Sequence, residues 1–136
     1  KVGMNLVMAT PEKYQYDHAE LGWIKQQVPD LDLRITTDPV EAVRDATAIY
    51  TDVWASMGQE AEREVRCRDF ADYQVNARLM SHAQKGAVFM HCLPARRGEE
   101  VTDEVIDGPQ SVIVQQAANR MHAQKGILAW LLGAKG

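Results

Sequence analysis

Several features that define common protein classes are scarce or missing in this chain of 136 residues. Its two cysteines, Cys67 and Cys92, stand far apart and form neither a zinc-type pair nor a disulfide framework. No apolar run approaches the roughly 20 residues that a membrane span requires. Residues 1–4 lack the hydrophobic core of a signal peptide. We therefore expect no membrane partner, and the free thiols favour a cytoplasmic protein.

Positive charge is also scarce. The 15 Lys and Arg residues are outnumbered by 19 Asp and Glu, and they are scattered apart from Arg96 and Arg97. This balance argues against a nucleic-acid partner. His18, His82 and His122 are spread out, and none has a second ligand at metal-binding spacing. The glycine-rich nucleotide motifs are missing as well, so the sequence predicts no metal and no cofactor.

What the chain does contain is typical of one globular α/β domain. Apolar residues make up 46% and charged residues 25% of the sequence, and the length suits a single core. Apolar runs that suggest strands alternate with helical patterns, which predicts a three-layer fold with a parallel sheet flanked by helices. The expected strands are 5–10, 33–37, 47–54, 87–90 and 111–114. The main expected helices begin near residues 17, 38, 60, 76, 102 and 116.

Local signals support several of these helices. Asp17 and Glu20 have the spacing of a capping box, Pro39 suits the first position of a helix, and Asn76 suits an N-cap. The tryptophans are expected in or near the core: Trp23, Trp54 and Trp130.

The apolar run 87–90 is followed by an unusual mixture of residues for a turn, His91-Cys92-Leu93-Pro94. Ligands of open parallel sheets bind just beyond the carboxyl ends of the strands, so this segment is a candidate site. Segments 52–58 and 119–120 also follow expected strands and should converge on the same edge. Adjacent strand residues point to opposite faces, which places His91 poorly for activating Cys92 as a nucleophile.

Several segments of the chain closely resemble the ornithine carbamoyltransferases. The matching segments are His91-Cys92-Leu93-Pro94, Arg97-Gly98-Glu99-Glu100-Val101, Asp107-Gly108-Pro109, residues 52–60 and residues 118–125. The resemblance covers nearly the whole chain, but only the carboxyl-terminal half of such an enzyme. It implies that residues 1–136 are a Rossmann-like ornithine-binding domain, truncated at its amino-terminal side. The family's carbamoyl-phosphate domain and the first strand of the second domain would be absent.

The resemblance implies roles for three residues around the carbamoyl group. Cys92 would sit beside the attacking amine of ornithine, and the carbonyls of Cys92 and Leu93 would accept hydrogen bonds from the carbamoyl amide. The bond between Leu93 and Pro94 is expected to be cis. Arg120, which on an ordinary helix would be a solvated side chain, would contact carbamoyl phosphate and polarise its carbonyl.

The resemblance also implies a binding loop for the amino-acid end of ornithine, made by Asp52, Ser56 and Met57. An isolated aspartate at a strand end is usually a turn residue. A carboxylate nevertheless favours a protonated partner, which suits the α-ammonium of ornithine better than the amine that must attack in neutral form.

The implied reaction transfers a carbamoyl group from carbamoyl phosphate to L-ornithine, giving citrulline and phosphate, in arginine metabolism and in a homotrimer. One alternative is a sibling transferase that acts on putrescine or acylated ornithine. Another is a non-catalytic, truncated binding module. The chain alone is expected to be inactive, because the resemblance places the phosphate grip in the missing domain and partly in a neighbouring subunit. It is also expected to be unstable, because the missing strand would lie between strands 6–9 and 49–51.

Overall fold

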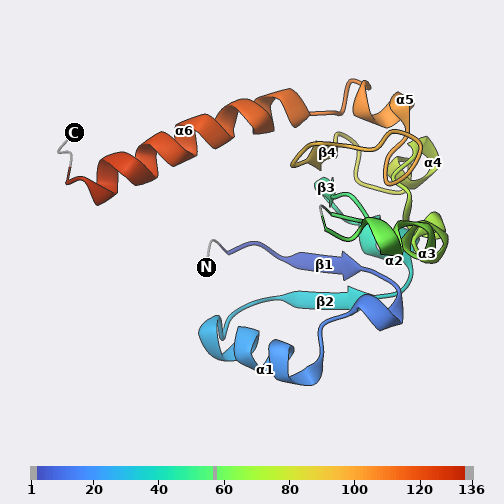
Figure 1. Cartoon of the computed structure of the whole chain (residues 1–136), viewed down its shortest axis with the longest axis horizontal. Helices are drawn as coiled ribbons and strands as arrows, with labels where there is room; N and C mark the ends of the chain where they lie inside the picture. The colour runs from blue at the N-terminus through green and yellow to red at the C-terminus, as the bar shows by residue number, and fades with distance from the viewer. Residues whose placement is uncertain (1–2, 57, 134–136) are drawn as a thin grey trace.

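The computed structural model describes residues 3–56 and 58–133 and has four short parallel strands and a set of helices (Figure 1). The strands are β1 (Leu6–Ala9), β2 (Leu33–Thr36), β3 (Ala48–Thr51) and β4 (Val88–His91). The α-helices are α1 (His18–Gln27), α2 (Pro39–Val43), α3 (Arg63–Asp69), α4 (Ala77–Met80), α5 (Asp103–Ile106) and α6 (Ile113–Leu131). Short 3₁₀ turns are η1 (Glu12–Tyr14), η2 (Glu60–Glu62) and η3 (Ala71–Tyr73).

The strands form two separate parallel pairs. β1 pairs with β2, with Leu6 opposite Leu33, and β3 pairs with β4, with Ala48 opposite Val88. Among the described residues, β1 and β3 do not pair with each other, although they are the inner strands in Figure 1. The α/β class is confirmed, and the break in the sheet falls where the sequence placed a missing strand.

The sequence signals for helix starts are confirmed in atomic detail. The backbone N–H of Glu20 donates to Asp17 Oδ1 at 2.8 Å, and the Asp17 N–H donates to Glu20 Oε2 at 2.9 Å. This is a complete capping box at the start of α1. Asn76 Oδ1 accepts from the N–H of Leu79 at 2.9 Å at the start of α4.

The expected strand at 111–114 is wrong. Ser111 makes only an isolated bridge to Phe89, and helix α6 begins two residues later, at Ile113. The Phe89 N–H donates to Gln110 O at 2.8 Å, and Phe89 O accepts from the Val112 N–H at 3.0 Å. A short apolar run fits a buried helix start as well as a strand, so periodicity could not separate the two.

The core lies on one side of the molecule, around β3 and β4. Phe89 is fully buried at its centre. The buried cluster comprises Val43, Ile49, Val75, Leu79, Met80, Phe89, Val101, Val105 and Ile106. No described residue of β1, β2 or α1 belongs to this cluster, so the first part of the chain contributes little to the core.

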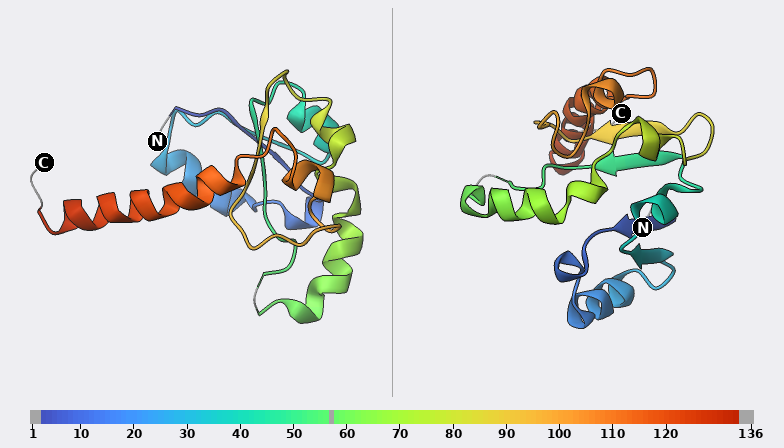
Figure 2. Two further views of the ribbon diagram at one scale, coloured as in Figure 1. Left: turned by 90° about the horizontal axis from the view of Figure 1, so that it is seen from above. Right: turned by 90° about the vertical axis from the view of Figure 1, so that its right-hand side faces the viewer.

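Two of the three tryptophans contradict the expectation of core positions. Trp23 is 64% exposed, because α1 turns a different face, with Leu21 and Ile24, toward the chain. Trp130 is 78% exposed, because the second half of α6 extends away from the other elements (Figure 2). Trp54 is partly buried and stacks on Phe70 at 6.1 Å between ring centroids.

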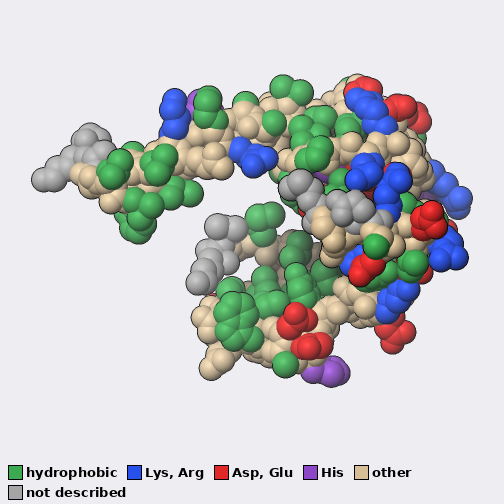
Figure 3. Space-filling model, viewed as in Figure 1, with side chains coloured by type: hydrophobic (Ala, Val, Ile, Leu, Met, Phe, Trp, Pro, Cys, Tyr) green, Lys and Arg blue, Asp and Glu red, His purple; other side chains and the backbone are tan. Residues whose placement is uncertain are grey.

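Helix α6 presents many apolar side chains to the surface, which gather toward its carboxyl end in Figure 3. The most exposed apolar residues of α6 and of its C-cap are Val114, Ile127, Leu128, Trp130, Leu131 and Leu132. Within the part of the chain that the structure describes, no helix has the length and apolarity needed to cross a membrane.

The two strand pairs are joined at their carboxyl ends by side chains. The Tyr14 hydroxyl, just after β1, donates to Asp69 Oδ2 at 2.7 Å. Lys13 forms an ion pair with the same carboxylate at 2.6 Å. The Tyr73 hydroxyl donates to the carbonyl of Thr37, just after β2, at 2.7 Å. These contacts connect the two pairs where backbone pairing does not.

Candidate functional site

The candidate site is formed where β3 and β4 end side by side. The register pairs Thr51 with His91, and continuing it by one residue places Asp52 beside Cys92. The donor atoms of the Asp52, His91 and Cys92 side chains all lie within 4.8 Å of one another. The predicted convergence of these two segments at one edge of the sheet is therefore observed.

The Cys92 thiol is held by two side chains of the neighbouring strand. Burial and a hydrogen bond to the Asp52 carboxylate raise the pKa of Cys92, while a hydrogen bond from Tyr50 works in the opposite direction. Desolvation and the contact with Cys92 raise the pKa of Tyr50 to about 12. The thiol is thus protonated at neutral pH and donates to Asp52. A protonated thiol is a poor nucleophile.

His91 is nearer to Cys92 than strand alternation predicts, because Cys92 lies beyond the end of β4. The ring is nevertheless committed elsewhere. Its Nδ1 accepts from the N–H of Leu93 at 2.8 Å, and its Nε2 lies 3.1 Å from Glu100 Oε1. With both nitrogens occupied, His91 cannot serve as a base for Cys92. The same contacts leave neither ring nitrogen of His91 free, whereas a metal ion among Asp52, His91 and Cys92 would need a free ring nitrogen and a thiolate.

The loop after Cys92 has the backbone that the resemblance implies. The peptide bond between Leu93 and Pro94 is cis. Leu93 has φ of 58°, in the left-handed region that a non-glycine residue rarely adopts. The Leu93 N–H is fixed by His91 Nδ1, so the backbone at Cys92 and Leu93 is held from inside the chain.

Helix α6 contributes two side chains to the site from one face. Arg120 is exposed, and its Nη1 lies 3.4 Å from the carbonyl oxygen of Cys92, which is long for a hydrogen bond. Gln116, four residues earlier, accepts from the His91 N–H through its Oε1 at 2.9 Å. Residues four apart lie on the same helix face. The sequence pointed to Arg120 but gave no role to Gln116.

The expected ornithine loop is only partly brought to the site. Asp52 is exposed, and its Oδ1 accepts from the Val53 N–H at 2.7 Å. Ser56 is exposed and bonds to Gln59 instead: its backbone N–H donates to Gln59 Oε1, and its carbonyl accepts from the Gln59 N–H. Among the described residues, no hydrogen bond joins Ser56 to Cys92 or to α6. Met57 lies outside the described residues.

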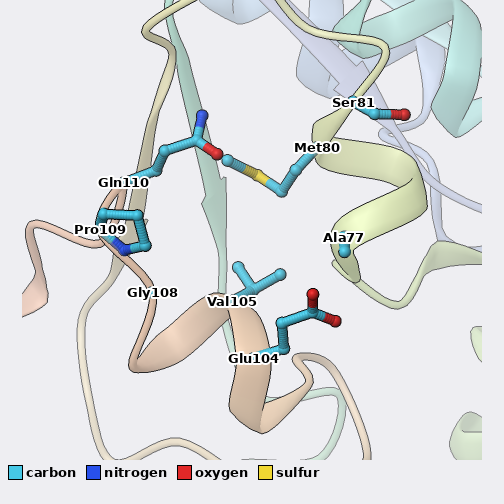
Figure 4. Close-up of a pocket in the computed structure, with 8 residues that line it drawn as sticks. All are labelled: Ala77, Met80, Ser81, Glu104, Val105, Gly108, Pro109 and Gln110. Carbon is cyan, nitrogen blue, oxygen red and sulfur yellow. The ribbon is translucent and has the colours of Figure 1, made fainter.

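Other hollows of the surface are separate from this site. The one shown in Figure 4 has a volume of about 230 Å³ and lies between α4, α5 and the segment before α6. Met80 and Gln110 reach into it, and the Gln110 side chain donates to the carbonyl of Ala87, before the start of β4. It is therefore near the opposite end of β4 from Cys92.

The structure is an α/β domain with its candidate site at the carboxyl edge of β3 and β4. Residues 1–131 match the family model described as "Aspartate/ornithine carbamoyltransferase, Asp/Orn binding domain". The chain belongs to the aspartate/ornithine carbamoyltransferase family and corresponds to this domain.

Individual relatives agree with this assignment. The chain is 53% identical to the ornithine carbamoyltransferase of Thermococcus kodakarensis over 98% of its length, which is 43% of that relative. It superimposes on the ornithine carbamoyltransferase of Pyrococcus furiosus with a TM-score of 0.87 and 52% identity, covering 98% of this chain and 44% of the other. For the anabolic enzyme of Campylobacter jejuni the TM-score is 0.89 at 31% identity, covering 98% and 45%. The chain thus spans less than half the length of these relatives.

The raised pKa of Cys92 predicts how its thiol reacts. Replacing Asp52→Asn removes the carboxylate that raises the pKa, so the thiolate fraction at pH 8 should increase and alkylation by iodoacetamide should become several-fold faster. Mass spectrometry of the Cys92 peptide of the folded full-length protein measures this rate. Asp45→Asn, at an exposed aspartate outside the site, is the matched control. An unchanged or slower rate in Asp52→Asn would contradict the assignment of the hydrogen bond.

Proposed function

We propose that this chain is the ornithine-binding domain of an ornithine carbamoyltransferase. The whole protein would transfer the carbamoyl group of carbamoyl phosphate to the side-chain amine of L-ornithine, giving citrulline and phosphate. The observation that carries the proposal is the meeting of Asp52, Cys92 and Arg120 at one strand edge. The three relatives described above are named ornithine carbamoyltransferases, which supports the choice of substrate. A solved N-acetyl-L-ornithine transcarbamylase is also similar, at 31% identity and a TM-score of 0.78, so the acylated substrate is kept as a competitor in the test.

In this proposal Asp52 holds the α-ammonium of ornithine, together with Ser56 and Met57. A carboxylate has about four acceptor positions. Asp52 uses two of these positions, for the Val53 N–H and the Cys92 thiol, so it can still accept from an ammonium group. The exposure of Asp52 allows a substrate to reach it.

The reacting amine must lose its proton before attack. An amine of this kind titrates near 10.4, so deprotonation at pH 7.4 costs about 4 kcal/mol. The proposed reaction uses no covalent nucleophile, because the raised pKa of Cys92 favours its protonated thiol. Catalysis would therefore come from orienting the neutral amine against the carbamoyl carbon and from stabilising the developing oxyanion.

Among the described residues of the site, Arg120 is the cation that can stabilise the oxyanion. Among the described residues, its guanidinium has one hydrogen-bond contact, to the Cys92 carbonyl oxygen at 3.4 Å. A bound carbamoyl amide would take the place of the guanidinium at this carbonyl. The exposed arginine would then turn to the carbamoyl oxygen. The carbonyls of Cys92 and Leu93 would accept from the carbamoyl amide and fix its orientation.

The remaining parts of the proposed enzyme lie outside this chain. A carbamoyl-phosphate domain would grip the phosphate, and the protein would act as a cytoplasmic homotrimer in arginine biosynthesis. Two relatives, from Pyrococcus furiosus and Campylobacter jejuni, are named as anabolic. A citrulline assay with the full-length protein tests the proposal, with ornithine, putrescine and N-acetylornithine in competition. Turnover of ornithine well above the other two is expected, and preference for either competitor would assign a sibling activity.

Asp52→Asn is expected to raise KM for ornithine about 10- to 100-fold in the full-length protein, because a hydrogen bond to a charged group contributes about 1.5–3 kcal/mol. Steady-state citrulline formation measures the effect, and Asp45→Asn is the matched control. An unchanged KM would remove Asp52 from the ornithine site.

A further inference from the structure

Glu100 is a buried acid to which the proposed chemistry gives no role. Its side chain is 0% exposed. Its Oε1 accepts from the backbone N–H of Arg96 at 2.6 Å and faces His91 Nε2 at 3.1 Å. Its Oε2 is buried and has no hydrogen-bond partner in the described part of the chain. Burying such a group is costly, so a purely space-filling residue would be favoured if packing were the only requirement.

The contacts of His91 determine which of its nitrogens carries the proton. The Leu93 N–H donates to Nδ1, so Nδ1 must be the unprotonated nitrogen. Nε2 therefore carries the hydrogen and donates it to Glu100 Oε1. The carboxylate of Glu100 thus selects the tautomer of His91 that can accept from Leu93, much as second partners orient histidines in other sites.

This series of contacts runs from one end of the loop 91–100 to the other. Glu100 itself is fixed, because its carbonyl accepts from the Val75 N–H at 2.9 Å. At the other end, Gln116 holds the His91 N–H. Between these anchors, the Leu93 N–H donates to the buried side chain of His91. Leu93 itself has φ of 58°. The direction of the Cys92 and Leu93 carbonyls depends on this backbone.

We propose that Glu100 is a positioning residue that, through the tautomer of His91, sets the direction of the Cys92 and Leu93 carbonyls toward the carbamoyl group. This inference rests on the proposed function. Without the carboxylate, His91 could carry its proton on Nδ1. Nδ1 could then no longer accept from the Leu93 N–H, and the two hydrogens would repel each other. The loop would then move, and misplacement of about 1 Å costs about 100-fold in rate.

The test compares Glu100→Leu, Glu100→Gln and Glu100→Asp in the full-length protein. Leucine removes the acceptor, and kcat should fall about 100-fold with KM for ornithine changed less than threefold. Glutamine retains an acceptor for His91 and Arg96 and should restore most of kcat. Aspartate keeps the charge, but its side chain is shorter by one methylene, so its carboxylate lies farther from His91 and kcat should be intermediate. If the leucine variant does not fold, the aspartate variant takes its place in the test.

Glu99→Leu is the matched control, because Glu99 is the adjacent glutamate and pairs with Arg63 rather than with His91. It should leave kcat unchanged. Equal losses in Glu99→Leu and Glu100→Leu, or no rescue by glutamine, would overturn the proposal in favour of a general packing role.

A second readout separates this proposal from the proposed function. The alkylation rate of Cys92, read on its peptide by mass spectrometry, reports the loop without any turnover. It should rise at least threefold in Glu100→Leu, or in Glu100→Asp, and not in Glu99→Leu. If the wild-type protein formed no citrulline but the alkylation rate still rose in this way, the proposed function would be refuted and the positioning role retained. An unchanged alkylation rate in an active enzyme would refute the positioning role alone.

Discussion

Replacing Arg120→Ala in the full-length protein is expected to lower kcat for citrulline formation by about 100- to 1,000-fold. The loss of one preorganised donor to a developing oxyanion has about this effect in other enzymes. KM for ornithine should change little, because Arg120 contacts the Cys92 carbonyl rather than the Asp52 side of the site. Arg120→Lys keeps the charge but not the planar donor geometry, so an intermediate rate is expected.

The control for Arg120 is Lys125→Ala, which removes a positive charge from the exposed surface of the same helix. Its kcat should equal that of the wild type. If Arg120→Ala retained kcat within tenfold, the arginine would be a helix-surface residue and the oxyanion would have to be stabilised by groups outside this chain.

Residues 1–136 alone are expected to show no cooperative unfolding transition and no citrulline formation. β1 and β3 each leave one backbone edge without a strand partner among the described residues. Each backbone hydrogen bond that a strand between them would supply contributes about 0.5–1.5 kcal/mol, against a total stability of about 5–15 kcal/mol. The exposed apolar side chains of α6 add a surface prone to association.

The stability of the isolated chain is measured by thermal and urea unfolding, followed by circular dichroism. Light scattering detects aggregation. The full-length protein is the comparison and should melt cooperatively. A single cooperative melt of the isolated chain at mesophile temperatures would contradict the expectation. Citrulline formation by the isolated chain would refute the need for a second domain.

The convergence of Asp52 with Cys92 could be predicted from the sequence, because neighbouring parallel strands end at the same edge. Tyr50 was missed, although it has a readable signal: it precedes Asp52 by two residues and therefore lies on the same face of β3. The link from Glu100 to His91 had no such signal. It depends on the path of an irregular loop, which no periodicity describes.

The errors have a common physical origin. The run at Ser111 was short enough to fit either a strand or a helix start, and only the tertiary position of Phe89 decides between them. Trp23 and Trp130 were assigned to the core by residue type. Burial depends on which helix face meets another element, and on whether the helix meets one at all.

The side-chain bonds from Tyr14 to Asp69 and from Tyr73 to Thr37 have a consequence for how a further strand could join the sheet. They hold both strand pairs at one end before any backbone pairing occurs between them. Ordering a residue costs about 1–2 kcal/mol in backbone entropy. An incoming strand would meet two edges whose relative placement is already restrained, so most of that cost falls on the strand alone. Tyr14→Phe and Tyr73→Phe would then mainly slow the joining of the further strand to the sheet. They would change the final stability less, because the new strand later connects the same two halves directly.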